Sequence, residues 1–107
     1  MRVQLHPAVE GELARAAEWY EERVLGLGDA LLDEVEHWFE VIAETPDTWP
    51  LWPGVRLRDP PVRRVLLGRF PHAIAYQAFE ERVFVLAVAS TSRKPCYWVT
   101  RTEDGSA

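Results

Sequence analysis

The run Arg82-Val-Phe-Val-Leu-Ala-Val-Ala89 contains seven consecutive apolar residues after its arginine. Successive side chains of a strand point to opposite faces, so a strand made of this run is apolar on both. Such a strand belongs in the middle of a sheet, with other parts of the chain covering each side. The run is far shorter than the roughly 20 apolar residues of a membrane-spanning helix. We therefore expect residues 82–89 to form a buried central strand.

Two shorter runs of strand-forming residues precede this one. Val62–Leu67 is bounded by Gly68, and Ala73–Phe79 is separated from the central run only by Glu80-Glu81. Links this short join antiparallel neighbours, because parallel strands need a crossover of a dozen residues or more. The three runs therefore predict an antiparallel meander.

Residues 46–61 contain five of the eight prolines, together with Trp49 and Trp52. Proline breaks helices and removes a ladder hydrogen bond from central strands. We expect an ordered, irregular crossover in which the two tryptophans fill a gap. The alternative is a lid or a partner surface.

Two helices are predicted in the first half of the chain. Apolar residues recur at steps of three and four over residues 9–24 and again over 27–42, which is the spacing of one helix face. Pro7 suits the first position of a helix, where its missing N–H costs nothing. Thr45 stands before Pro46 and so ends the second helix. The aromatic residues of these helices are expected in the core or between the helices, rather than as anchors for a partner: Trp19, Tyr20, Trp38 and Phe39.

The link between the helices is predicted at Gly26–Gly28, with the second helix starting at about Asp29. Helices joined by about three residues lie nearly antiparallel. The alternating segment Arg2–Leu5 reads as a brief strand before them. The predicted fold is α+β, with a short N-terminal strand and a two-helix hairpin packed on a small, mainly antiparallel sheet in the order β-α-α-β-β-β. At the C-terminus, Tyr97-Trp-Val99 adds a final strand or turn.

Length and composition favour a small single-domain protein. Its 107 residues, 48% of them hydrophobic, fit a single domain spanning 1–107, with residues 102–107 expected to fray. A single cysteine, Cys96, permits no internal disulfide, and the N-terminus carries no apolar segment of the secretory kind. We expect a cytoplasmic protein that does not enter the membrane.

Charge is divided unevenly along the chain. Residues 1–48 hold three arginines against twelve acids, a net −9, whereas residues 49–107 hold eight arginines and Lys94 against five acids, a net +4. General coating of nucleic acid needs a net cationic face, so this division of charge argues against it. We also expect no direct sequence-specific DNA binding by this chain. The division leaves room for a basic patch on the second half.

Motifs for metals, nucleotides and nucleophilic catalysis are missing from the sequence. His6, His37, His72 and Cys96 have no metal-ligand spacing, and no glycine-rich phosphate loop occurs, so no metal and no cofactor are implied. His37 is expected at the surface, and Cys96 is expected to be a buried or idle thiol.

Cationic residues of the second half, together with one tryptophan, form the candidate binding patch. Its members are Arg63, Arg64, Arg69, Arg93, Lys94, Trp98 and Arg101. Guanidinium groups gathered on one sheet face would suit carboxylates or phosphates. The alternative is a solvated strand face whose charge balances the acidic helices.

A series of short motifs resembles the RelE/ParE toxin superfamily over about residues 2–101. They run in order along the chain: Glu18-Trp-Tyr20, Arg63-Arg64, Arg69-Phe-Pro71, Ile74-Ala-Tyr76, Val85-Leu-Ala-Val88 and Arg93-Lys-Pro-Cys-Tyr-Trp98. The Arg-Phe-Pro and Arg-x-Pro-x-Tyr-Trp runs are most similar to the ParE-like, or plasmid-stabilisation, branch. The resemblance implies the toxin of a type II toxin–antitoxin system, held inactive by a cognate antitoxin.

Two activities within the superfamily make different demands. ParE-like members bind and inhibit DNA gyrase, whereas RelE-like members cut mRNA on the ribosome and need groups for proton transfer. Arg93 and Tyr97 match the C-terminal Arg…Tyr pair of the nucleases. The arginine that nucleases carry on the middle strand falls here on His72 or Ala73, and Lys94 is the only lysine.

The sequence therefore favours a ParE-like gyrase inhibitor without enzymatic activity. The position after Ala89, commonly histidine in ParE-like sequences, is Ser90. The alternatives are a RelE-like mRNA interferase that uses Arg93 and Tyr97, and a binding module without toxicity. All three predict that apolar surface near the helices and the sheet edge accepts a segment of the antitoxin.

Overall fold

The strand β4, Arg82–Ser90, lies inside a four-stranded sheet with the order β1-β4-β3-β2. The computed structural model describes residues 1–55 and 58–103. Every side chain of β4 from Val83 to Ala89 is buried. The prediction of a central strand that is covered on both faces is confirmed.

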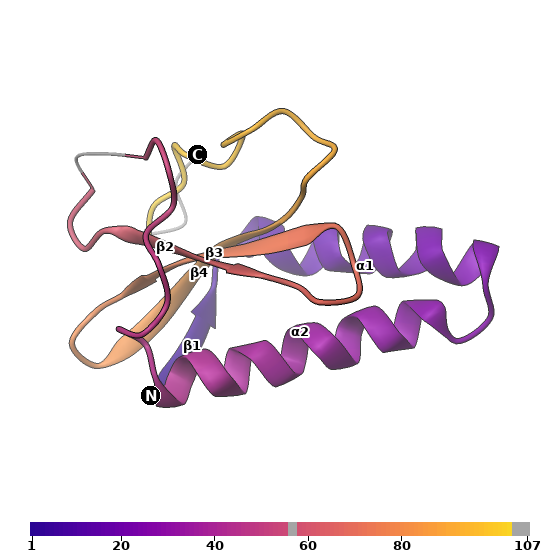
Figure 1. Ribbon diagram of the computed structural model, residues 1–107, viewed down its shortest axis with the longest axis horizontal. Helices are drawn as coiled ribbons and strands as arrows, with labels where there is room; N and C mark the ends of the chain where they lie inside the picture. Colours follow the sequence, from indigo (N-terminus) through magenta and orange to yellow (C-terminus); the bar gives the residue numbers. More distant parts are fainter. Residues whose placement is uncertain (56–57, 104–107) are drawn as a thin grey trace.

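Two antiparallel strands continue the sheet on one side of β4 (Figure 1). They are β3, His72–Ala78, and β2, Val62–Leu66. Strand β3 pairs antiparallel with both β4 and β2, so the predicted meander is confirmed, and no strand boundary differs from the prediction by more than one residue. On the other side, β1, Arg2–Leu5, pairs parallel with β4. A parallel pair needs a long crossover, which the two helices and the meander together provide.

Helices α1, Pro7–Arg23, and α2, Leu27–Glu44, run side by side as an antiparallel hairpin (Figure 1). Pro7 occupies the first turn of α1, as its sequence position predicted. The hairpin packs on one face of the sheet and extends beyond it. The chain therefore has the predicted β-α-α-β-β-β order.

The link between the helices differs from the prediction. Helix α2 begins at Leu27 rather than near Asp29, and Gly28 lies inside it. Gly26 precedes the helix in the left-handed region, at φ 87°, which glycine adopts without strain. A Cβ on Gly28 would lie 2.4 Å from the carbonyl oxygen of Ala17. Gly28 is thus required for the close contact of the two helices rather than for a turn.

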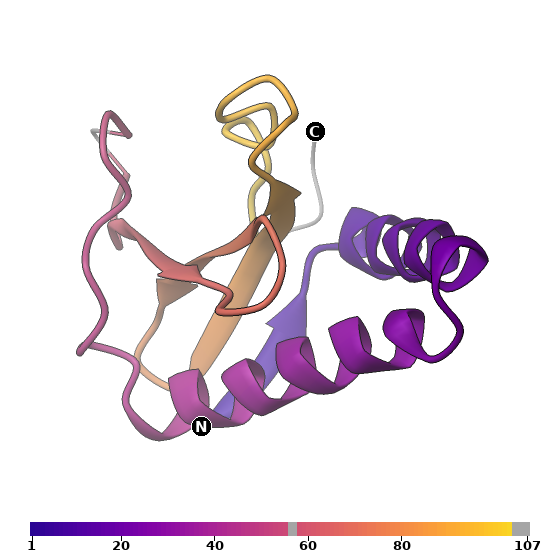
Figure 2. The same cartoon turned by 45° about the vertical axis from the view of Figure 1, so that its right-hand side comes forward.

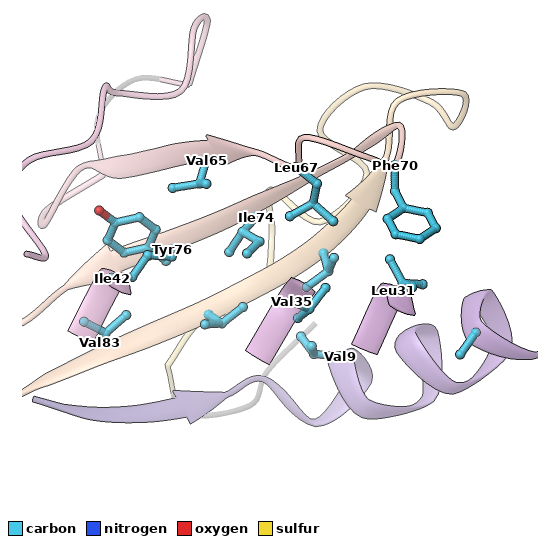
Figure 3. Close-up of a cluster of buried hydrophobic side chains, with 13 residues drawn as sticks. Val9, Leu31, Val35, Ile42, Val65, Leu67, Phe70, Ile74, Tyr76 and Val83 are labelled. Atoms are coloured by element: carbon cyan, nitrogen blue, oxygen red, sulfur yellow. The ribbon is translucent and has the colours of Figure 1, made fainter. Parts of the chain in front are cut away.

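The main core lies between the helical hairpin and the sheet (Figure 3). Its labelled members are Val9, Leu31, Val35, Ile42, Val65, Leu67, Phe70, Ile74, Tyr76 and Val83. Tyr20, Trp38 and Phe39 pack against it as predicted. Trp19 does not, because 51% of its surface is exposed. That part of the aromatic prediction is wrong: Trp19 contacts Tyr20 and Arg23 of its own helix instead.

A second, smaller core covers the other face of the sheet. It includes Phe84, Leu86 and Trp98, with Trp52 and Tyr97 packed against its margin. Figure 2 shows the segments that supply this cover, the crossover after α2 and the chain after β4, on the side of the sheet opposite α2. The segment around Trp98 forms turns and no further strand.

The proline-rich crossover is ordered over its described residues. It lies along the outer edge of β2. There the backbone N–H of Trp52 donates to the Val62 carbonyl at 2.8 Å, and the backbone N–H of Arg64 donates to the Pro50 carbonyl at 2.8 Å. Trp49 packs against the main core and Trp52 against the second. The prediction that the tryptophans fill gaps is confirmed.

Of the tail expected to fray, residues 104–107 lie outside the described residues. Within the part that the structure describes, neither helix combines the length and apolarity that crossing a membrane requires.

Candidate functional site

A cleft of about 440 Å³ opens between α1 and the ends of the two central strands. We call it the α1 cleft. Helix α1 contributes Glu12, Arg15 and Trp19 to its wall, β3 contributes His72, and the loop after β4 contributes Arg93. Tyr20, Ser90, Ser92 and Tyr97 also line it. Side chains from distant parts of the sequence therefore meet here.

Glu12 is the centre of the charged contacts in this cleft. Its two carboxylate oxygens accept hydrogen bonds from Arg101 at 2.9 and 2.7 Å. Both side chains are almost buried, with 10% of Glu12 and 11% of Arg101 exposed. Arg101 also donates to the Leu86 carbonyl at 3.0 Å. The hydrogen bonds to Glu12 raise the pKa of Arg101, so this pair stays charged.

The structure brings together Arg93 and Tyr97, the pair that a nuclease would use. The Arg93 guanidinium carbon lies 3.9 Å from the centre of the Tyr97 ring, and Arg93 Nη1 lies 3.9 Å from Glu12 Oε2. Burial is the main cause that raises the pKa of Tyr97, and the charge of Glu12 and a hydrogen bond with it add to the effect. The hydroxyl of Tyr97 is therefore protonated at neutral pH.

His72 lies deep in the same cleft, with 6% of its surface exposed. Its Nδ1 has no hydrogen-bond partner among the described residues. Burial lowers the pKa of His72, so the imidazole is neutral at neutral pH. Its ring lies 6.0 Å from the Tyr20 ring, and Ser90 is its register partner on β4.

A shallower groove of about 130 Å³ lies on the opposite face of the sheet. We call it the basic groove, since Arg64, Arg93 and Lys94 line it. Its apolar wall includes Trp52 and Trp98, whose rings meet edge to face at 4.8 Å. Arg93 borders both cavities because it lies on the loop that passes over the end of β4.

Of the other members of the predicted patch, Trp98 borders this groove and Arg63, Arg69 and Arg101 do not. Arg63 faces the helices and donates to the Trp49 carbonyl at 2.7 Å, so it fastens the crossover. Arg69 is exposed in the turn before β3, where the Glu34 carboxylate accepts its backbone N–H at 3.3 Å. Trp98 is fully buried, and Arg101 is 9% exposed and bound to Glu12. These four cannot form one accessible surface with Arg64, Arg93 and Lys94.

Sequence reasoning missed Glu12, Arg15 and Arg58. The sequence does carry one signal for Glu12, because its steps of three from Val9 and four to Ala16 place it beside the buried face. Arg58 donates to the carbonyls of Val99 and Arg101 at 2.7 and 2.9 Å and so holds the C-terminal segment. No sequence signal marked Arg58, because the carbonyls that it binds lie more than 40 residues away.

The predicted surface position of His37 is confirmed. Cys96 is half-buried beside the second core, with its backbone in the left-handed region at φ 57°. Over residues 1–55 and 58–103, no three His, Cys, Asp or Glu side chains gather into a set that could hold a metal ion.

Comparison of the chain with models of known protein families and with curated proteins gives no match. The class of the protein therefore has to be argued from its fold, its motifs and the geometry of the two cavities.

Proposed function

We propose that the chain is the toxin of a type II toxin–antitoxin pair of the ParE-like kind. In this proposal it acts in the cytoplasm by binding and inhibiting DNA gyrase, and a cognate antitoxin neutralises it. The support is the ordered motif series of the sequence, which lies on a β-α-α-β-β-β fold whose short first strand pairs with the last.

The state of Tyr97 favours inhibition by contact over catalysis. Metal-independent RNA cleavage needs groups that exchange protons with the 2′-hydroxyl and the leaving oxygen. Burial and the charge of Glu12 raise the pKa of the Tyr97 hydroxyl, so it stays protonated and is no base at neutral pH. Lys94, the only lysine, lines the basic groove, whereas Tyr97 lines the α1 cleft. This separation of the proton-transfer groups is the observation on which the proposal rests.

The surface best suited to gyrase is the basic groove. Arg64 is partly buried there and Lys94 is exposed, and both belong to the cationic half of the chain. Charged groups at such a surface steer association and set specificity.

Purified gyrase tests the proposal directly. The wild-type chain is expected to inhibit supercoiling and to trap cleaved DNA, and the double variant Arg64→Gln/Lys94→Gln is expected to need at least tenfold more protein for the same effect. Arg2→Gln, which removes one exposed charge from β1, is the matched control and should inhibit like wild type. Supercoiling that is unaffected by excess wild-type chain would reject gyrase as the target.

The antitoxin is expected at the tip of the helical hairpin. Three apolar side chains are exposed there: Val24 by 56%, Leu25 by 92% and Leu32 by 39%. The hairpin belongs to the half of the chain with net charge −9, so the matching segment is basic and amphipathic.

Copurification with the product of the adjacent small open reading frame tests this contact. Leu25→Asp is expected to weaken the complex at least tenfold. Leu51→Asp, at a side chain 55% exposed on the crossover, is expected to leave it unchanged. Equal effects of the two variants would place the partner elsewhere.

One observation favours the RelE-like alternative. Arg93 and Tyr97 adjoin, with the guanidinium 3.9 Å from the ring, as a nuclease pair would. If that reading is right, ribosomes loaded with mRNA show cleavage that Arg93→Ala and Tyr97→Phe abolish. Intact transcripts reject the alternative, and harmless overexpression without antitoxin would favour a non-toxic binding module.

A further inference from the structure

We propose that the α1 cleft binds a small ligand that carries an anionic oxygen group and a flat unsaturated ring. Mononucleotides and aromatic carboxylates share this chemistry. The inference goes beyond the proposed function, because it concerns the purified chain and requires neither gyrase nor an antitoxin.

The rim of the cleft carries positive charge that the protein does not neutralise. Glu12 gives both of its oxygens to Arg101, at 2.9 and 2.7 Å, and only a distant 3.9 Å contact to Arg93. The Arg93 side chain is 55% exposed, so its N–H groups can reach a ligand. Guanidinium groups bind carboxylates and phosphates through paired N–H donors.

Arg15 adds a second available cation at the mouth of the cleft. It is exposed, and the structure gives its guanidinium no hydrogen bond or ion pair among the residues it describes. Gly11 leaves room for it, since a Cβ there would lie 3.2 Å from Arg15 Nη1. Arg15 has no ion pair among the described residues, and Arg93 has only its 3.9 Å contact with Glu12 and its contact with the Tyr97 ring. Both guanidinium groups therefore keep N–H donors for an anion.

An aromatic side chain forms part of the wall. Trp19 lines the cleft with 51% of its surface exposed. It is held in place, because the Arg23 guanidinium lies 3.5 Å from its ring centre and the Tyr20 ring meets it edge to face at 5.0 Å. An exposed but fixed indole suits a flat ring.

The wall of the cleft includes a buried histidine, His72. Only 6% of the surface of His72 is exposed, and its Nδ1 has no hydrogen-bond partner among the described residues. The Ser90 and Ser92 hydroxyls, 2.8 Å apart, stand beside it on the same wall.

The volume of the cleft sets the size of the ligand. About 440 Å³ lies within the range of roughly 300–1,000 Å³ that is typical of small-molecule pockets. The cleft therefore fits one flat ring system with its charged substituent rather than a length of polymer.

Titration of the ¹⁵N-labelled chain with two probes, adenosine monophosphate and indole-3-acetate, tests the proposal by NMR. At least one probe is expected to saturate, with shifts at His72 Nδ1 and the Trp19 indole N–H. It should bind at least tenfold more tightly than inorganic phosphate, which lacks the ring, and than adenosine, which lacks the charge. Stronger binding of the nucleotide identifies a phosphate ligand, and stronger binding of indole-3-acetate identifies a carboxylate ligand.

Two variants and a control locate the binding. Arg15→Gln and Arg93→Gln are each expected to weaken the tighter probe about tenfold, the loss of one charge-assisted contact. Arg2→Gln, at an exposed arginine of β1 outside the cleft, should change the affinity less than twofold. Three results overturn the proposal: no saturation by either probe at millimolar concentration, binding of phosphate as tight as that of the better probe, or equal affinities for all three variants.

Discussion

Glu12 joins the C-terminal segment to the first helix through a single carboxylate. Its partner Arg101 lies 89 positions away in the chain, and 11% of the Arg101 side chain is exposed. Removing one member of a buried ion pair is far more costly than removing a surface pair, because the remaining charge keeps its desolvation penalty.

We therefore expect Glu12→Gln to lower the free energy of unfolding by about 3 kcal/mol. Urea denaturation at pH 7 measures the loss. Glu10→Gln is the control, since Glu10 is exposed on the same helix and its change should stay within about 0.5 kcal/mol. Similar losses in the two variants would show that the Arg101 pair contributes little.

Tyr76 gives the protein a dependence on alkaline pH. Its hydroxyl donates to the Pro46 carbonyl at 2.7 Å. Burial raises the pKa of Tyr76 from 10.0 to about 12, against an opposing effect of Arg63 and with a small further rise from Asp47. A group whose pKa is higher in the folded state stabilises the protein fully below the unfolded pKa and loses this effect as pH rises through the folded pKa.

The Tyr76→Phe variant isolates that dependence. At pH 7 it should lower the free energy of unfolding by about 1 kcal/mol, the value of one hydrogen bond. Between pH 10 and about 12 the difference from wild type should shrink, because only the wild type loses the contribution of Tyr76. Tyr20 and Tyr97, whose pKa values are also raised, are present in both proteins and cancel. A difference that stays constant across this range would contradict the prediction.

Single residues of the site were only partly predictable. The sequence indicated Arg93 and Tyr97, because they lie four positions apart in a motif run, and the structure places them in contact. It could not indicate the role of Glu12 or His72, because each depends on contacts between segments that only the fold brings together. Arg101 was predicted to face a partner, yet the same guanidinium binds an internal carboxylate just as well.

Among the elements, the helical hairpin depends on one close contact. Gly28 of α2 faces the Ala17 carbonyl of α1, and a Cβ there would approach that oxygen to 2.4 Å. The Glu21 carboxylate also accepts the backbone N–H groups of Gly26 and Gly28 at 2.8 and 2.9 Å, so α1 caps the start of α2. The two helices must therefore stay at this distance.

Gly28→Ala is expected to destabilise the protein by about 2 kcal/mol or more, although alanine favours helices by about 1 kcal/mol. Gly11→Ala is the matched change in α1, where a Cβ would meet only the flexible end of Arg15. It should be neutral or stabilise by up to about 1 kcal/mol. Thermal unfolding of both variants measures the contrast, and two stabilising substitutions would show that the helices can separate.

Elements with a clear periodicity were predicted to within about two residues. The apolar run of β4 identified the central strand, and the steps of three and four identified both helices. The start of α2 was misplaced, because a glycine that permits close packing looks the same in sequence as one that permits a turn. The path of residues 50–52 along β2 was also beyond sequence reasoning, since an edge contact has no periodic signature.

The whole molecule consists of a helical layer, a sheet and an irregular cover. The acidic half of the chain supplies the helices, and the basic half supplies three strands and the cover after β4. The cleft and the basic groove both lie where the loop after β4 crosses the end of the sheet, so Arg93 borders each. The two cavities therefore share the arrangement of this cover, and loss of the cover should disturb both.

Trp98 is the main apolar side chain of that cover. Its exposed fraction is 0%, and its Nε1 has no hydrogen-bond partner in the described chain. Trp98 therefore stabilises the fold by packing against the sheet. Trp98→Ala is expected to lower the free energy of unfolding by about 3–5 kcal/mol and to increase binding of a hydrophobic dye to the uncovered face. Trp19→Ala, at a tryptophan 51% exposed on α1, should cost less than about 1 kcal/mol. Equal losses in urea denaturation would mean that the segment after β4 is not a structural layer, and the contacts of Arg58 and Arg101 would then have to hold it alone.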